Sequence, residues 1–275
     1  MSYKTILVHA GVDSDADSRL QAAFALGERF GATIVGVGAF AWDPYVDPTL
    51  GYADGETIMA LRGLVDSDIA AAEAKFKRAA KDYKHPIVWR GLVDYPAKAM
   101  NALACGADLI IASRVPAKTD DRRFASPTDL IMGSGLPVLL FPAGHSQIRG
   151  GKVLVGWKNT RETRRAVSDA LPLLQAADHV HLVQVAEHDA VGGQAQAGLD
   201  DLVERLARHQ VFAEASIAPQ IGESVVDDLM DVARSRECGL VVLGAYGHSR
   251  LREWALGGVT AYLLDAGDRP ILFSR

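Results

Sequence analysis

The sequence predicts an α/β protein made of two tandem units, each a five-stranded parallel sheet doubly wound with helices. Short apolar runs that suit buried strands alternate with amphipathic segments that suit helices, and this alternation occurs twice along the 275 residues. Strands that alternate with helices are joined by right-handed crossovers, so neighbouring strands run parallel.

The two halves begin alike. An apolar strand is predicted at residues 4–8 and again at 152–155, and a polar turn and an amphipathic helix follow each strand. Gly31 is the predicted C-cap of the first of these helices. The apolar positions of the two helices are Leu20, Ala23, Phe24 and Phe30 in one, and Ala166, Val167, Ala170, Leu171 and Leu174 in the other.

The later elements repeat as well. Residues 91–112 align without a gap with residues 222–243, and this pairs a buried fourth strand at 109–111 with one at 240–242. The remaining expected elements are second strands at 33–37 and 179–185, second helices at about 56–83 and 198–209, and last strands at 137–141 and 270–273. With a polar linker at 143–151, the expected domains are residues 1–143 and 151–275.

Composition narrows the class of protein. A net charge of −5 argues against broad nucleic-acid binding, and no apolar run approaches the length of a membrane span. Because no secretory signal is visible at Met1, we expect a cytoplasmic location. The two cysteines, Cys105 and Cys238, suit reduced structural thiols better than a disulfide.

The most informative motif follows the fourth strand of the second half. The apolar run at 240–243 leads into Gly244, Gly247 lies three residues later, and Gly257 and Gly258 form a glycine pair further along. A glycine-rich turn after a buried strand lets backbone amides approach a phosphate. The motif therefore predicts a nucleotide site.

Two tandem α/β units with this glycine spacing resemble the universal stress protein family, over nearly the whole chain. Gly244, Gly247 and Gly257 match that family's nucleotide-binding motif, in which Ser or Thr occupies the place of Gly258. The resemblance implies a Rossmann-like, adenine nucleotide hydrolase-like fold with the two halves packed as a pseudo-dimer. It also implies binding of ATP or another adenine nucleotide, with or without Mg²⁺.

The resemblance extends the site to further residues, several with a second interpretation. Lys158 stands where relatives carry an Asp, and it either faces phosphate as a point charge or is a solvated surface lysine. Val185 and Leu243 either hold the adenine or are strand-end core, and Gly222 either lines the cleft or serves only its turn. The complete expected site is Gly156, Lys158, Val185, Gly222, Leu243, Gly244, Gly247, Gly257, Gly258, Val259 and Thr260.

The first half lacks this motif. Ser113 takes the place of Gly244 and Pro116 that of Gly247, and proline removes an amide donor, so we expect one site per chain. Asp13 and Ser14, after the first strand, are explained as a helix-capping turn.

No catalytic or metal-binding residue is predicted. The eight histidines form no zinc signature, although His179 and His181 alternate along one strand, and no nucleophile with its base is recognisable. We therefore expect a stress-response regulatory protein that binds an adenine nucleotide, with slow ATP hydrolysis at most. The alternatives are a scaffold that binds no nucleotide and, last, a small-molecule hydrolase or transferase. The two halves are expected to pack together, because pairing would cover the edge at the fifth strand of each sheet, and a homodimer of whole chains is a further expectation.

Overall fold

The strands form a single ten-stranded sheet. The computed structural model describes residues 2–41, 55–114, 124–186, 193–222, 224–245 and 268–275. Its strand order is β3-β2-β1-β4-β5-β10-β9-β6-β7-β8, and all neighbours are parallel except β5 and β10. The strands are β1 (Thr5–His9), β2 (Thr33–Ala39), β3 (Ile87–Leu92), β4 (Leu109–Ser113), β5 (Val138–Phe141), β6 (Lys152–Gly156), β7 (His179–Ala186), β8 (Ala213–Pro219), β9 (Leu240–Gly244) and β10 (Ile271–Ser274).

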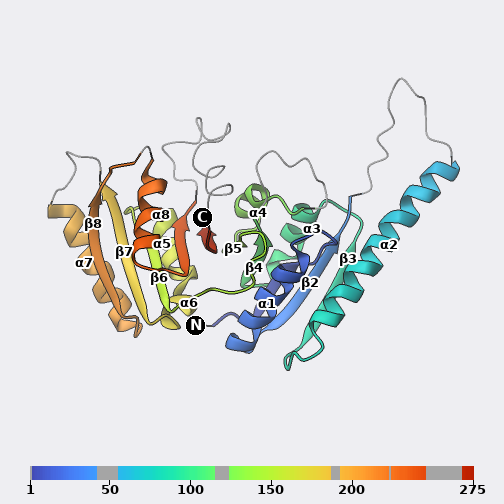
Figure 1. Cartoon of the computed structure of the whole chain (residues 1–275), viewed down its shortest axis with the longest axis horizontal. Helices are drawn as coiled ribbons and strands as arrows, with labels where there is room; N and C mark the ends of the chain where they lie inside the picture. Colours follow the sequence, from blue (N-terminus) through green and yellow to red (C-terminus); the bar gives the residue numbers. More distant parts are fainter. Residues whose placement is uncertain (1, 42–54, 115–123, 187–192, 223, 246–267) are drawn as a thin grey trace, which may run out of the picture.

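The two predicted five-stranded units are confirmed, and their last strands join them. β5 and β10 pair antiparallel, with Leu139 opposite Leu272. In Figure 1 the first half, blue to green, lies beside the second half, yellow to red, and these two strands meet between them. The pairing removes an open edge from each unit, which satisfies the backbone groups that an edge strand exposes.

Helices cover both faces of the sheet. One core cluster lies under α1, α2, α5, α6 and α7, the other lies under α3, α4 and α8, and each contains residues of both halves. The helices are α1 (Ala16–Phe30), α2 (Gly55–Ala79), α3 (Pro96–Leu103), α4 (Pro127–Gly133), α5 (Arg161–Asp169), α6 (Leu171–Gln175), α7 (Gly193–Arg208) and α8 (Val225–Ser235), with a short 3₁₀ helix at Ala104–Gly106.

Local signals explain where several helices end. Gly31 is the C-cap of α1 as predicted, with a left-handed φ of 62° and its N–H donating to the Gly27 carbonyl. The helix expected over 56–83 ends at Ala79, because Tyr83 makes a backbone turn to Ala80 and donates its hydroxyl to the Ala32 carbonyl. In the second half, α7 begins at Gly193, earlier than expected.

Within the described ranges, every helix is too short or too polar to cross a bilayer.

Candidate functional site

The carboxyl ends of β9, β6 and β7 lie side by side in the second half. Gly156 pairs with Leu243 on one side and with Val183 on the other. The carboxyl ends of parallel strands lie along one side of a sheet, which we call the carboxyl edge. Predicted residues from three separate segments therefore lie together at this edge. Gly156, Lys158, Val185, Leu243 and Gly244 all lie at it, and Gly222 follows the neighbouring strand β8.

Two of the predicted glycines have packing reasons for lacking a side chain. A Cβ on Gly244 would lie 2.6 Å from the Thr163 nitrogen, because the first turn of α5 rests directly on the end of β9. A Cβ on Gly156 would lie 2.6 Å from Cδ2 of Leu243. Close approach of the α5 backbone therefore accounts for Gly244 independently of any ligand, whereas Gly156 meets only the ends of leucine side chains.

The other predicted side chains differ in exposure. Lys158 is exposed, in a tight turn where the Thr160 N–H donates to the Lys158 carbonyl at 2.6 Å. Leu243 is buried in the core cluster beneath α8, and Val185 is half-buried against the same cluster. The edge thus offers an apolar wall beside the solvent-facing Lys158.

Gly222 is exposed, and its amide is already used. The N–H of Gly222 donates to Oδ1 of Asp228 at 2.8 Å, and that of Ile221 donates to the same carboxylate at 3.2 Å. Asp228, in the first turn of α8, is 8% exposed. Asp228 was not predicted from the sequence, although Ser224 ahead of an apolar run is a recognisable N-cap, and its Oγ accepts from the Asp227 N–H.

Five predicted site residues lie outside the described ranges. These are Gly247, Gly257, Gly258, Val259 and Thr260. Their part in a phosphate site remains a prediction.

In the first half, a buried ion pair occupies the corresponding edge. Arg19 of α1 donates from Nη2 to Oδ2 of Asp13 at 2.7 Å, from Nη1 to Oγ of Ser113 at 2.7 Å, and from Nε to the His9 carbonyl at 2.6 Å. The side chains of Arg19 and Asp13 are 0% and 1% exposed. The network links the ends of β1 and β4 with α1.

This network corrects the interpretation of Asp13 and Ser14 as a capping turn. Asp15 is the N-cap of α1, and its side chain caps nothing. Asp13 does accept from the Asp15 N–H at 3.0 Å, but its carboxylate is mainly the partner of Arg19. Arg19 could have been noticed, because it lies on the apolar face of α1 beside Leu20.

Burial and the charge of Arg19 together set the ionisation of Asp13 and His9. Burial raises the pKa of Asp13, but hydrogen bonds from Arg19 and its charge outweigh that effect and hold the pKa below its ordinary value. Burial and the charge of Arg19 lower the pKa of His9 to about 3. Asp13 is therefore ionised and His9 neutral at neutral pH.

The second half also has a buried polar atom that lacks a partner at its edge. Trp157, directly after β6, is 7% exposed, and its indole Nε1 has no hydrogen-bond partner among the described residues. A buried N–H without an acceptor is costly, so the end of β6 fits a ligand that supplies an acceptor.

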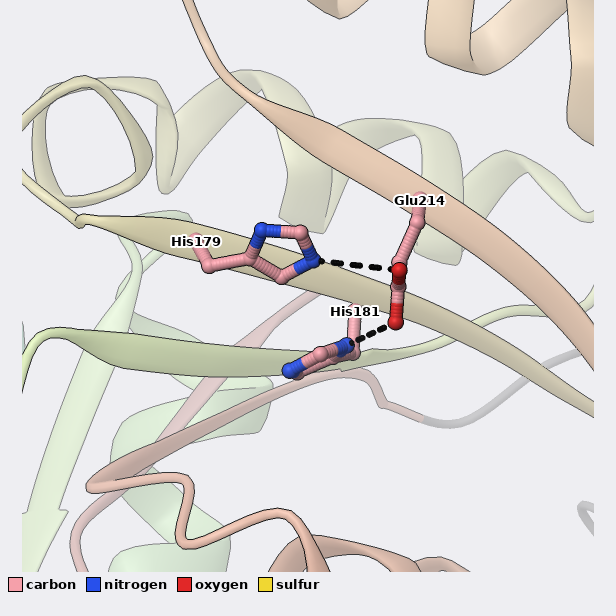
Figure 2. Close-up of side chains that lie close together, drawn as sticks. All are labelled: His179, His181 and Glu214. Carbon is pink, nitrogen blue, oxygen red and sulfur yellow. Dashed lines mark hydrogen bonds and ion pairs between the residues drawn. The ribbon is translucent and has the colours of Figure 1, made fainter.

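At the opposite end of the sheet the structure brings together residues that the sequence analysis did not connect. His179 and His181 on β7 both face Glu214 on β8, as Figure 2 shows. One atom of each of the three side chains lies within 4.8 Å of the others. The alternation of the two histidines was visible in the sequence, but the strand carrying Glu214 was not placed.

Comparisons with known proteins agree with this fold. Residues 151–275 match the model of the universal stress protein family. A universal stress protein from Archaeoglobus fulgidus DSM 4304 is similar with a TM-score of 0.73 at 13% identity, over 100% of this chain and 97% of that one. A putative universal stress protein from Pseudomonas aeruginosa UCBPP-PA14 is similar with a TM-score of 0.63 at 16% identity, over 99% and 93% of the two chains. Among curated proteins nothing matches.

Proposed function

We propose that the second half of this chain binds an adenine nucleotide. The chain belongs to the universal stress protein family through residues 151–275. ATP, with or without Mg²⁺, is the expected ligand. The protein acts as a regulatory binding module, with a single site per chain at the carboxyl ends of β6, β7 and β9. In this proposal residues 1–143 form a domain that has lost its site.

The difference between the two halves at this edge is the observation that carries the proposal. Strand register makes Ile6, beside Leu109, equivalent to Val153, beside Leu240. The same offset along the chain places Ala166 where the first half has Arg19, and Thr160 where it has Asp13. The buried ion pair at the carboxyl edge of the first half is therefore replaced in the second half by Thr160 and Ala166, which carry no charge.

Charge and hydrogen bonding at the second edge also support an anionic ligand. Lys158 is exposed there, and α5 begins beside it with Thr160 as its N-cap. The indole N–H of Trp157, which has no partner among the residues that the structure describes, adds a donor. A lysine ammonium and an unsatisfied donor both favour phosphate or carbonyl oxygens.

Regulation requires that the nucleotide prefer one conformation of the protein. A ligand that binds two states equally shifts no equilibrium, however tightly it binds. The proposal therefore includes a difference in affinity, which partners sense as a changed surface. The cytoplasmic location and the homodimer expected from the sequence remain predictions.

A direct test is to denature freshly purified protein and identify any small molecule released, by chromatography and mass spectrometry. Calorimetry with ATP, AMP and GTP then measures affinity. Gly247→Val is expected to abolish binding because a β-branched side chain fills the expected cradle. Gly106→Val is the matched control, since nothing lies within 4 Å of a Cβ at Gly106.

Lys158→Ala distinguishes the two interpretations of that residue. If the ammonium faces phosphate, the variant loses more affinity for ATP than for AMP. Equal affinities for wild type and Lys158→Ala would make Lys158 a surface lysine, and unchanged ATP binding in Gly247→Val would refute the site assignment.

The scaffold alternative is favoured by the packing around Gly156 and Gly244 and by the use of the Gly222 amide within the protein. These features explain three predicted residues without a nucleotide. If no nucleotide is released and millimolar ATP produces no binding heat, the scaffold function replaces the proposed one.

A further inference from the structure

The amino-terminal end of β7 carries a pocket unrelated to the glycine motif. It is open, has a volume of about 440 Å³, and is lined by Lys152, His179, His181, Glu214 and Arg236. β7 runs from His179 to Ala186, so the pocket lies roughly 23 Å from the proposed nucleotide edge, at about 3.3 Å per residue.

Strand register builds the centre of this pocket. His179 and His181 are two residues apart, so their side chains leave β7 on the same face, and the ring centroids are 4.4 Å apart. Glu214 on β8 is the direct register partner of His181. Two imidazoles and a carboxylate are thus held by the backbone of adjacent strands, where little rearrangement is needed to bring them together.

The spacing of these groups suits a tetrahedral metal ion. Nδ1 of His181 lies 2.8 Å from Oε1 of Glu214, and Nε2 of His179 lies 3.5 Å from Oε2. Ligand atoms at about 2.0–2.1 Å from a tetrahedral zinc ion are about 3.3 Å from one another. The two separations, each to a different carboxylate oxygen, lie on either side of that value, and one ligand atom of each of the three side chains lies within 4.8 Å of the others.

The histidines also have unused hydrogen-bonding capacity. Nε2 of both rings is buried and makes no hydrogen bond within the described part of the chain, and Nε2 of His179 is the atom that lies 3.5 Å from Oε2 of Glu214. His181 is 8% exposed. A buried ring nitrogen without a partner is costly, and a metal ion that takes the His179 lone pair would remove that cost.

Arg236 leaves a conflict that a metal ion would resolve. Nη1 of Arg236 lies 2.8 Å from Nδ1 of His181 and also donates to Oε1 of Glu214. Nδ1 cannot accept from Arg236 while it donates to Glu214. The Arg236 side chain is 35% exposed, so it can turn to solvent and leave both atoms to a cation.

We propose that His179, His181 and Glu214 bind a divalent transition-metal ion of the zinc class. Imidazole nitrogens favour zinc and related ions over magnesium or calcium, and a site with three protein ligands leaves a fourth position for water or an exogenous group. The site binds its ion independently of nucleotide.

The test uses the full chain without an affinity tag, stripped with a chelator and titrated with ZnCl₂ by calorimetry. The wild type is expected to bind one ion per chain. His179→Ala and Glu214→Gln are each expected to weaken zinc binding at least about tenfold. His85→Ala is the matched control, because His85 and Glu28 form a similar pair at 3.6 Å in the first half, and this variant should bind as the wild type does. Circular dichroism establishes that each variant is folded.

Two further measurements sharpen the result. Co²⁺ in the site should give the strong visible absorption of tetrahedral coordination, and Glu214→Gln should remove it. Arg236→Gln should bind zinc several-fold more tightly, since it removes the competing cation. The proposal is overturned if no stoichiometric zinc binds, if His179→Ala and Glu214→Gln bind as the wild type does, if Mg²⁺ binds equally well, or if Arg236→Gln does not bind more tightly.

Discussion

Arg19 and Asp13 form a buried ion pair, 2.7 Å between Nη2 and Oδ2, at the carboxyl edge of the first half. Ser113 and the His9 carbonyl take further hydrogen bonds from the same guanidinium. In the first half, the Arg19–Asp13 ion pair therefore occupies the place that is equivalent to the proposed ligand site of the second half.

Breaking this pair should cost much stability. Arg19→Met leaves the Asp13 carboxylate buried and uncompensated, and the free energy of unfolding is expected to fall by about 3–5 kcal/mol in urea denaturation at neutral pH. Adding Asp13→Leu should recover most of the loss. Lys75→Met, which breaks the exposed pair with Asp17, should cost less than about 1 kcal/mol and serves as the control. Equal effects of Arg19→Met and Lys75→Met would contradict this prediction.

His9 should make stability depend on pH. Its pKa in the folded protein is about 3, against an ordinary value of 6.5. On acidification, the His9 imidazole of the unfolded chain is therefore protonated below pH 6.5, whereas that of the folded protein is protonated only below about pH 3. Its contribution to stability is complete above that window and is lost as the pH falls through it, at up to about 1.4 kcal/mol per pH unit.

The test compares urea unfolding of the wild type and His9→Leu from about pH 7 to pH 4. The variant should show the shallower loss of stability on acidification. His145→Gln, which alters a half-buried ring, should follow the wild type. Parallel pH profiles for the wild type and His9→Leu would show that folding does not lower the pKa of His9.

Gly244→Ala should destabilise the second half without any ligand being present. The added Cβ lies 2.6 Å from the Thr163 nitrogen, so α5 must move away from β9, at a cost of about 1–3 kcal/mol. Gly106→Ala meets nothing within 4 Å and should not be destabilising. Thermal and urea unfolding measure both variants, and a neutral Gly244→Ala would mean that α5 is not seated on the strand as described.

The two halves should unfold together. Both core clusters contain residues from each half, and Tyr3 of the first half donates its hydroxyl to the Asp169 carbonyl of the second at 2.6 Å. Tyr3→Phe is expected to cost about 1 kcal/mol and to shift a single transition, seen alike by circular dichroism and tryptophan fluorescence. Separate transitions for the two probes would contradict this cooperativity.

The order of elements was predictable because the information is local. Apolar runs indicated β4 and β9, and their gapless alignment gave the repeat that the structure confirms. Gly31 was correctly predicted as a C-cap for an equally local reason, the need for a left-handed φ. The first turn of α1 was less predictable, because Asp13 suits either a capping turn or a buried ion pair. Only the position of Arg19 decides between these two roles.

The candidate site was only partly predictable. The family resemblance brought Gly156, Val185 and Leu243 together as one predicted site, and the strand order β9-β6-β7 places them at one edge. The packing of α5 on Gly244 and the use of the Gly222 amide by Asp228 depend on distances between elements, which periodicity does not contain.

By itself, the sequence determined the repeated α/β architecture, because hydrophobic spacing and capping residues act over a few positions of the chain. Only the tertiary structure decided that β5 and β10 pair antiparallel with Leu139 opposite Leu272, that Arg19 forms a buried ion pair with Asp13, and that His181 meets Glu214. Each of these depends on atoms far apart in the chain that approach within a few ångströms, and burial there makes charge and hydrogen bonding strong enough to matter.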